Sequence, residues 1–258
     1  MTATVSFEKH DGVAVVAMNR PEALNGFTTE LCSDLLTALE KANDDADVRA
    51  VVLTGTGRCF SAGADLNEGL NSDRSLQYKL QYEYRAPLQA IMEMPKPIIA
   101  AVPGFAAGIG LGFVLSCDLV VMAEDAFLLS PFTTISLLPD GGINFLLVRQ
   151  LGYQRAFQLS IESERINAER CVQLGLANRT AAADDVRDVA ISWGQELCKR
   201  APLSVAATKK VMRRALDSNW SDCYNLEAEL QNSLGSTEDS AEGIAAFLEK
   251  REPVFKGK

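Results

Sequence analysis

Apolar runs that alternate with segments of helical spacing constrain the fold of this chain more than any other feature. Residues 13–18 and 50–53 are compact apolar runs, and each ends at residues that stop strands. The segment 28–43 lies between them and places four leucines on one helical face: Leu31, Leu35, Leu36 and Leu39. The predicted order is therefore strand, helix, strand.

The same alternation continues along the chain. We expect a helix over residues 76–92 and a strand over residues 97–102. A glycine-rich segment at 104–112 then precedes a further apolar run at 119–123. Alternation of this kind predicts an α/β fold with a mainly parallel sheet covered by helices.

From about residue 144 onward the pattern is predominantly helical. The segments with helical spacing are 142–151, 153–161, 168–174, 184–199, 202–217, 221–234 and 238–250. No low-complexity linker separates the two halves of the chain. We therefore predict an α/β core over residues 1–195 and a helical C-terminal region over residues 196–258, packed on the core or on another subunit.

Composition and charge disfavour several classes of function. The chain has 258 residues with 47% hydrophobic content, which fits two average domains or one large α/β domain. A formal net charge of -9 opposes a general nucleic-acid role, because phosphate binding normally requires a basic face. The N-terminal sequence lacks a secretory pattern, and no apolar run approaches the roughly 18 residues of a membrane helix. We expect a cytoplasmic protein with no membrane partner.

Cysteine and histidine usage argues against metal and redox sites. The six cysteines are dispersed and form no C-x-x-C pair, so free and mostly buried thiols are predicted instead of a zinc module. His10 is the one histidine, which excludes a site with several histidine ligands. A Ser-His-Asp triad would need that same N-terminal residue. We expect no metal ion.

Two segments indicate sites built from the backbone. In CFSAGADL at 59–66, Gly63 permits a sharp turn that exposes the N–H of Ala64, and Asp65 can cap the helix or turn that follows. The segment 104–112 carries four glycines, and a helix that starts there directs free N–H groups into a cleft. Its spacing is not G-x-G-x-x-G, which favours an oxyanion site over a phosphate loop. A tight turn and close helix packing are the alternative interpretations.

Several ordered motifs carry a family resemblance. They are NRPEALN at 19–25, VVLTGTGRCFSAGADL at 51–66, PKPIIAAVPGFAAGIGLGFVLSCDLVVMAEDAFL at 95–128, LLPDGG at 137–142 and FLEKREPVF at 247–255. Together they resemble the crotonase superfamily, also called the enoyl-CoA hydratase/isomerase superfamily, over essentially the whole chain. The resemblance implies a spiral of ββα units with a helical trimerisation region, assembled as homotrimers or homohexamers.

The resemblance also implies an acyl-CoA substrate whose thioester oxygen accepts hydrogen bonds from the N–H groups of Ala64 and Ile109. Such donors stabilise an enolate, and one of them can lower the barrier by roughly 3 kcal/mol. No cofactor is implied beyond the coenzyme A moiety of the substrate. The other positions assigned to substrate binding are Ala23, Leu24, Ala62, Gly63, Asp65, Leu66, Gly108, Gly110 and Phe132. Basic groups that would either meet CoA phosphates or remain solvated are Arg20, Arg58 and Lys250.

The catalytic carboxylate separates the possible reactions. Hydratases of this superfamily use two glutamates, and Gly112 and Phe132 occupy those positions here, so the usual hydration mechanism is disfavoured. Asp140 lies where isomerase-type relatives carry an acid, and one carboxylate there can move a proton between C2 and C4. Burial beside an acyl chain would raise its pKa. The alternative role for Asp140 is a helix N-cap, while Asp65 and Asp118 are expected to be turn or capping groups.

The sequence therefore predicts an enoyl-CoA isomerase with Asp140 as its proton shuttle. Two alternatives stay open. One is a hydratase with a rearranged acid, and the other is a noncatalytic acyl-CoA-binding protein in which Asp140 only caps a helix.

Overall fold

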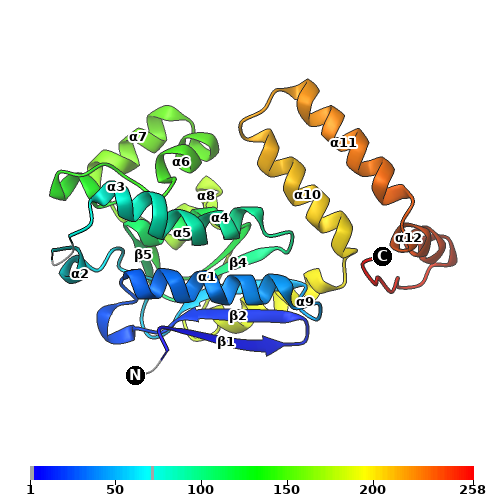
Figure 1. Ribbon diagram of the computed structural model, residues 1–258, viewed down its shortest axis with the longest axis horizontal. Coiled ribbons are helices and arrows are strands. Elements are labelled where there is room, and N and C mark those ends of the chain that lie inside the picture. Colours follow the sequence, from blue (N-terminus) through cyan, green and yellow to red (C-terminus); the bar gives the residue numbers. More distant parts are fainter. Residues whose placement is uncertain (1–2, 71–72) are drawn as a thin grey trace.

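The computed structural model describes residues 3–70 and 73–258 and has a six-stranded sheet at its centre (Figure 1). In their order across the sheet the strands are β1 (Val5–His10), β2 (Val13–Met18), β3 (Ala50–Gly55), β4 (Ile98–Val102), β6 (Leu119–Ala123) and β9 (Arg179–Ala181). β1 pairs antiparallel with β2, and the other neighbouring strands pair parallel. The predicted α/β class is confirmed.

The strands β2, β3 and β4 are buried along their whole length. Helix α1 (Thr29–Asp44) packs against β1 and β2, and helix α9 (Val186–Cys198) packs against β2, β3, β4 and β6. Parallel strands covered in this way have no solvent-facing side, so they appear in the sequence as continuous apolar runs. The predicted strands at 13–18, 50–53, 97–102 and 119–123 are all present, with shifts of one or two residues at their ends.

A smaller sheet contains β5 (Phe105–Ala107), β7 (Phe127–Leu129) and β8 (Ile166–Asn167). The sequence did not predict these strands, because two or three residues are too few to show a period. β5 leads through Gly108 into helix α5 (Ile109–Ser116), all of whose residues are buried. This short sheet therefore positions the second glycine-rich segment.

The helix predicted over residues 76–92 is divided into three parts. It consists of α3 (Leu76–Tyr78), a π-helical turn η2 (Lys79–Tyr84) and α4 (Arg85–Glu93), and α2 (Leu66–Leu70) precedes it. A continuous helical spacing in the sequence therefore does not reveal the change of hydrogen-bond register at η2.

Polar contacts hold the segment around η2 against the start of α1. The buried Lys79 donates to Glu68 at 2.9 Å, and the buried Glu83 accepts from the Thr29 hydroxyl at 3.0 Å. Glu68 also accepts from the Thr29 backbone N–H at 3.1 Å, where a carboxylate is favoured by the helix dipole. Glu68 thus has a structural role that its sequence context did not indicate.

The predicted C-terminal helices are confirmed within a few residues. They are α6 (Ile143–Leu151), α7 (Tyr153–Glu162), α8 (Ala168–Leu174), α9, α10 (Pro202–Ala215), α11 (Trp220–Gly235) and α12 (Glu238–Glu249). Figure 1 shows α10 and α11 extending to one side of the sheet, and neither helix has a fully buried residue. The division between residues 195 and 196 falls inside α9 and stays a prediction.

Asp118 anchors α10 to the core. Its carboxylate accepts from Lys209 at 2.7 Å, from Arg213 at 2.8 Å and from the backbone N–H of Ile98 at 2.9 Å. Asp118 lies at a bend and accepts a backbone N–H, as expected of a turn or capping group, but its ion pairs give it a further role that the sequence did not indicate. An ion pair between residues this far apart in sequence leaves no local signal.

The described residues, 3–70 and 73–258, include no helix that is both long and apolar enough to span a bilayer.

Replacing Asp118 with asparagine should destabilise the protein, because Lys209 and Arg213 then lose their counter-ion in a largely buried place. Breaking a buried ion pair costs about 3–5 kcal/mol, and partial exposure lowers the expected loss to about 2–3 kcal/mol. Urea unfolding at neutral pH measures the change. Asp184→Asn, at an exposed turn, is the matched control. Equal unfolding free energies for the two variants would contradict this role of Asp118.

Candidate active site

The two glycine-rich segments run side by side at the centre of the site. An isolated parallel bridge joins Ser61 to Ala106, and the N–H of Ala107 donates to the carbonyl of Ser61 at 3.0 Å. Since the segments run in the same direction, Ala64 and Ile109 each lie three residues beyond this bridge. The two N–H groups that the resemblance assigned to the thioester oxygen therefore belong to neighbouring turns.

Gly63 and Gly108 allow this close approach. Both have positive φ, at 106° and 54°, which other residues rarely adopt. A Cβ on Gly63 would lie 3.0 Å from the carbonyl oxygen of Ala107 and 3.5 Å from the Cα of Gly108. Gly110 is constrained by lack of space, because an added Cβ would lie 2.9 Å from the Cβ of Ser61.

The N–H groups of Ala64 and Ile109 donate no hydrogen bond to any residue that the structure describes. Phe27 donates to Gly63 at 2.8 Å and accepts from Asp65 at 3.0 Å, so the N–H of Ala64 between them faces away from this pairing. Ile109 is the first residue of α5 and has no intrahelical acceptor. Both groups are free to bind an anionic oxygen, and the dipole of α5 favours negative charge at Ile109.

A polar scaffold that the sequence analysis missed fixes the Gly63 turn. The hydroxyl of Ser61 donates to the carbonyl of Asn25 at 2.8 Å and accepts from the N–H of Gly63 at 3.1 Å. The fully buried side chain of Asn25 donates to the carbonyls of Thr56 and Cys59. Asn25 and Ser61 belong to the quoted motifs, but only their contacts in the structure show that they fix the Gly63 turn.

The segment from Ala23 to Leu24 forms one edge of the site. The carbonyl of Leu24 accepts from the N–H of Ala62 at 2.9 Å, which brings these two expected substrate-binding positions together. Ala62 is exposed, and Leu66 is 62% exposed, so both remain available for a ligand.

Asp65 has a structural partner at the same edge. Its carboxylate pairs with Arg20 at 3.0 Å, which lowers the pKa of Asp65 against the opposing effect of burial, and it also accepts from the N–H of Asn67 at 3.1 Å. The capping role expected for Asp65 is confirmed. Arg20 is bound by Asp65 and by the carbonyl of Gly26, which disfavours its assignment to a CoA phosphate.

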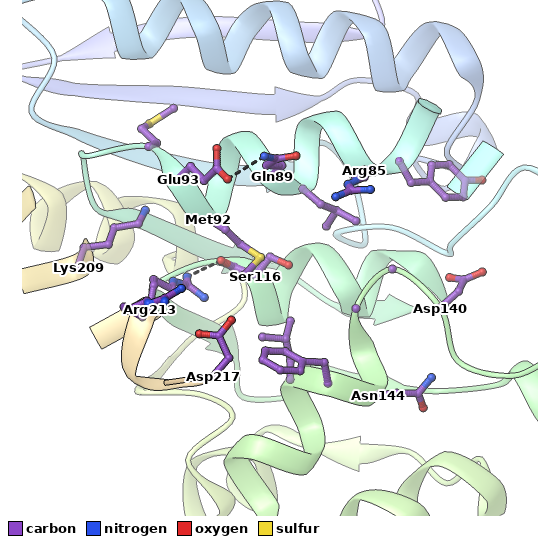
Figure 2. A pocket seen from close by; sticks show the side chains of 18 of the residues that line it. Arg85, Gln89, Met92, Glu93, Ser116, Asp140, Asn144, Lys209, Arg213 and Asp217 are labelled. Carbon is purple, nitrogen blue, oxygen red and sulfur yellow. Dashed lines mark hydrogen bonds between the residues drawn. The ribbon is translucent and has the colours of Figure 1, made fainter. Parts of the chain in front are cut away.

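Asp140 lies on a loop that packs directly against Ile109. A Cβ on Gly141 would lie 2.1 Å from the Cδ1 atom of Ile109 and 3.7 Å from Leu88, so the Ile109 side chain fills the space beside this loop. The Asn144 side chain donates to the carbonyl of Pro139 and fixes the loop to α6. Figure 2 shows Asp140 on this loop, with Asn144 on the helix that follows.

The Asp140 carboxylate is largely buried and lacks a hydrogen-bond partner among the described residues. Its Oδ1 atom is shielded from solvent and accepts no bond. Burial raises the pKa of Asp140 to about 6. The N-cap of α6 is Gly142, without a side-chain bond, and only the backbone carbonyl of Asp140 accepts from Ile143. The helix-cap interpretation of Asp140 is therefore wrong.

Tyr84 lies close enough to Asp140 for the carboxyl group to affect its pKa. Burial first, and then the Cys32 thiol and the Asp140 carboxyl, raise the pKa of the Tyr84 phenol, which stays protonated at neutral pH. Its ring packs edge-on against Phe27, which stacks on Phe113 at 4.3 Å.

Asp140 lines a groove of about 1150 Å³ that extends between α4, α6 and α10. Apolar side chains on its wall include Leu80, Tyr84, Leu88, Leu138, Phe145 and Leu146. Ile109 adjoins this groove through its contact with Gly141, which lines it, and Ala64 lies on the turn beside Ile109. A thioester carbonyl held at the N–H groups can therefore place its acyl carbons toward Asp140.

The positions of the two hydratase glutamates supply no acid. A Cβ on Gly112 would lie 3.0 Å from the carbonyl oxygen of Gly141, so a glutamate there would push the Asp140 loop away. Phe132, the first residue of a short 3-10 helix (Phe132–Ile135), is buried with its ring against Gly108. In residues 3–70 and 73–258, no group of three or more His, Cys, Asp or Glu side chains is placed to hold a metal ion.

Comparison with known proteins decides the family. A family model described as enoyl-CoA hydratase/isomerase matches residues 8–258. The chain belongs to the enoyl-CoA hydratase/isomerase family. Its members act on acyl-CoA substrates, so the predicted resemblance and crotonase-type fold are both confirmed.

Enoyl-CoA hydratase/isomerase relatives of this chain carry the names of different reactions. A probable enoyl-CoA hydratase of Rhodobacter capsulatus is 37% identical, over 99% of this chain and 98% of the relative. A 1,2-epoxyphenylacetyl-CoA isomerase of Escherichia coli is 32% identical, over 96% of each. The crystal structure of an enoyl-CoA hydratase from Polaromonas sp. JS666 matches with a TM-score of 0.93 at 32% identity, covering 97% of this chain and 99% of that one. The family membership identifies an acyl-CoA enzyme and leaves its reaction open.

Replacing Asp140 with asparagine should stabilise the folded protein above pH 6 and have little effect near pH 4. The folded-state pKa of about 6 exceeds the ordinary value of 3.8, so the stability of the wild type falls as pH rises between these values. At pH 8 we expect a gain of about 2 kcal/mol for the variant, after allowance for the partial exposure of the carboxylate. Urea unfolding from pH 4 to 8 measures it. The same pH dependence in Asp125→Asn, at an exposed turn, would contradict this account.

Proposed function

We propose that this enzyme moves the double bond of an acyl-CoA from C3–C4 to C2–C3, with Asp140 carrying the proton. The observation that supports this proposal is a buried carboxylate without a hydrogen-bond partner in the described structure, directly beside the segment of Ile109. A buried charge without a partner lowers the stability of the fold. Carboxylates with a pKa perturbed in this way are therefore candidates for catalysis.

The proposed reaction has two proton transfers and no net change in composition. Asp140 removes a proton from C2, the electron pair of that C–H bond forms a C1–C2 double bond, and the carbonyl π pair moves to the thioester oxygen to give a dienolate. The N–H groups of Ala64 and Ile109 would hold the negative oxygen. Protonated Asp140 then delivers the proton to C4, the C2–C3 double bond forms, and the thioester carbonyl is restored.

The raised pKa of Asp140 suits this exchange. At neutral pH a group with a pKa of about 6 is mainly ionised, so it is available as a base. It is also a stronger base than an ordinary aspartate, and once protonated it is an acid close to the operating pH. A single group can therefore serve both transfers.

A hydratase with a rearranged acid is the second candidate. The names of the Rhodobacter and Polaromonas relatives support it. Hydration would require a group that activates water and a proton source, and Gly112 and Phe132 supply neither. A noncatalytic acyl-CoA binder receives less support, because Asp140 does not cap α6.

Assembly and ligand requirements complete the proposal. We propose a homotrimer or homohexamer, because large apolar side chains on α6 and α7 are exposed in the single chain: Phe145, Val148, Tyr153, Phe157 and Ile161. The coenzyme A moiety of the substrate would pass along Ala23 and Leu24, and no further cofactor is proposed. A cytoplasmic location stays a prediction.

Replacing Asp140 with asparagine should lower the isomerisation of a 3-enoyl-CoA by about a thousandfold or more, because a general base typically contributes 10²–10⁴. Binding of an inert acyl-CoA should change little. In the wild type, the pH profile of kcat/KM should rise through about pH 6, where Asp140 loses its proton. Stopped assays of the 3-enoyl and 2-enoyl thioesters, with calorimetric binding, measure all three quantities.

Hydration of a 2-enoyl-CoA, assayed in parallel, separates the two candidate reactions. The account predicts weak hydration by both proteins. Strong hydration by the wild type would favour the hydratase, and isomerisation at the wild-type rate by Asp140→Asn would exclude Asp140 as the base. Asp125→Asn is again the control.

A further inference from the structure

One face of α10 lines the groove and is strongly basic. The residues of this face recur at helical spacing: Ala206, Lys209, Lys210, Arg213 and Arg214. Over these positions the helix rises about 12 Å, and Asp217 follows its end. Arg85 contributes a further cation from α4 on the wall that carries Leu88. A basic groove stands out in a chain whose net charge is -9.

The cations of the groove differ in what they already bind. Lys209 and Arg213 share the Asp118 carboxylate, and each also donates to a backbone carbonyl. Within the described part of the chain, the side chains of Arg85, Lys210 and Arg214 make no hydrogen bond or ion pair, and all three residues are exposed and line the groove. These three cations form the free basic set.

The groove is lined by five cations and three acids, and in the described part of the chain none of these acids forms an ion pair with the free basic set. Glu93 and Asp217 also line the groove, and Glu93 accepts from Gln89 at 2.7 Å. Asp140 lies toward the end of the groove that also holds Arg85, whereas Lys209, Arg213 and Asp217 lie toward the other end (Figure 2).

The geometry of the proposed reaction determines which part of the substrate enters the groove. The thioester oxygen would lie at Ala64 and Ile109, and Asp140 must reach both C2 and C4. The acyl chain beyond C4 therefore continues past Asp140, along Leu80, Tyr84 and Leu88, toward the cations. The coenzyme A moiety leaves on the other side of the carbonyl, toward Leu24.

We propose that the substrate's acyl chain ends in a carboxylate, so that the enzyme acts on the mono-CoA thioester of a dicarboxylic acid. This inference rests on the proposed function, because Asp140 sets the direction of the chain. The apolar wall accommodates the methylene groups, and a cation of the free basic set binds the terminal carboxylate through charge-assisted hydrogen bonds.

Calorimetric binding of matched saturated thioesters tests the proposal. The pairs are hexanoyl-CoA with adipyl-CoA, octanoyl-CoA with suberyl-CoA, and decanoyl-CoA with sebacyl-CoA. At one chain length or more, the diacid thioester should bind at least about tenfold more tightly than its monoacid partner, since hydrogen bonds to charged groups contribute this much. The chain length with the largest ratio of diacid to monoacid affinity indicates how far along the groove the binding cation lies.

Arg85→Gln, Lys210→Gln and Arg214→Gln locate the cation, with Arg155→Gln, on the exposed surface of α7, as the control. At least one of the three should lower diacid affinity about tenfold while leaving monoacid affinity unchanged, and the unchanged monoacid binding shows that the variant is folded.

Three results are adverse, and they can be told apart. Equal binding of diacid and monoacid thioesters at every length would overturn the inference and leave the proposed function standing. An equal loss of both affinities in the variants would assign the cations to the CoA phosphates and also overturn it. Failure of the wild type to bind any of the thioesters would count against the proposed function itself.

Discussion

The close approach of two backbone segments is the constraint on which the site depends. The Ser61–Ala106 bridge and the glycines at 63 and 108 bring two turns into contact, and a side chain at either glycine would strain or separate them. The buried Asn25 and the Ser61 hydroxyl hold the first turn, and β5 and α5 hold the second. Because the exposed donors are main-chain N–H groups, the walls around them can change without loss of the donors. Ile109 illustrates this, since its side chain packs on Gly141 and leaves its own N–H free.

Electrostatics then distinguishes the acids around this scaffold. Asp65, Glu68 and Asp118 each accept bonds from a cation or from backbone N–H groups, and all three hold elements together. Among the described residues Asp140 has no such bond, and its carboxylate is largely buried, so its ionised form is destabilised and its pKa rises to about 6. The same property that makes this carboxylate unfavourable for folding makes it useful as a proton carrier. In the proposed mechanism the site therefore needs only two main-chain donors and one carboxyl group.

Much of the fold was predictable from the sequence, because parallel strands buried on both faces form continuous apolar runs and the long helices keep one apolar face. The short strands β5, β7, β8 and β9 were not predictable, since their two or three residues show no period. Residues 76–92 gave the wrong impression of one helix because η2 keeps a helical side-chain pattern. Within the site, the glycine turns and Asp140 were predicted from the motifs. The Asn25–Ser61 contact and the pairing of Asp118 with α10 join residues distant in sequence, and no local pattern indicates them.

Transfer of an isotope label within the substrate tests the central claim most directly. A 3-enoyl-CoA that carries deuterium at C2 is converted in ordinary water, and the product of the first turnovers is analysed by NMR and mass spectrometry. If one carboxyl group carries the proton from C2 to C4, part of the deuterium must appear at C4 of the 2-enoyl product. A product whose C4 gains hydrogen only from solvent, from the first turnover onward, would contradict transfer by Asp140 alone.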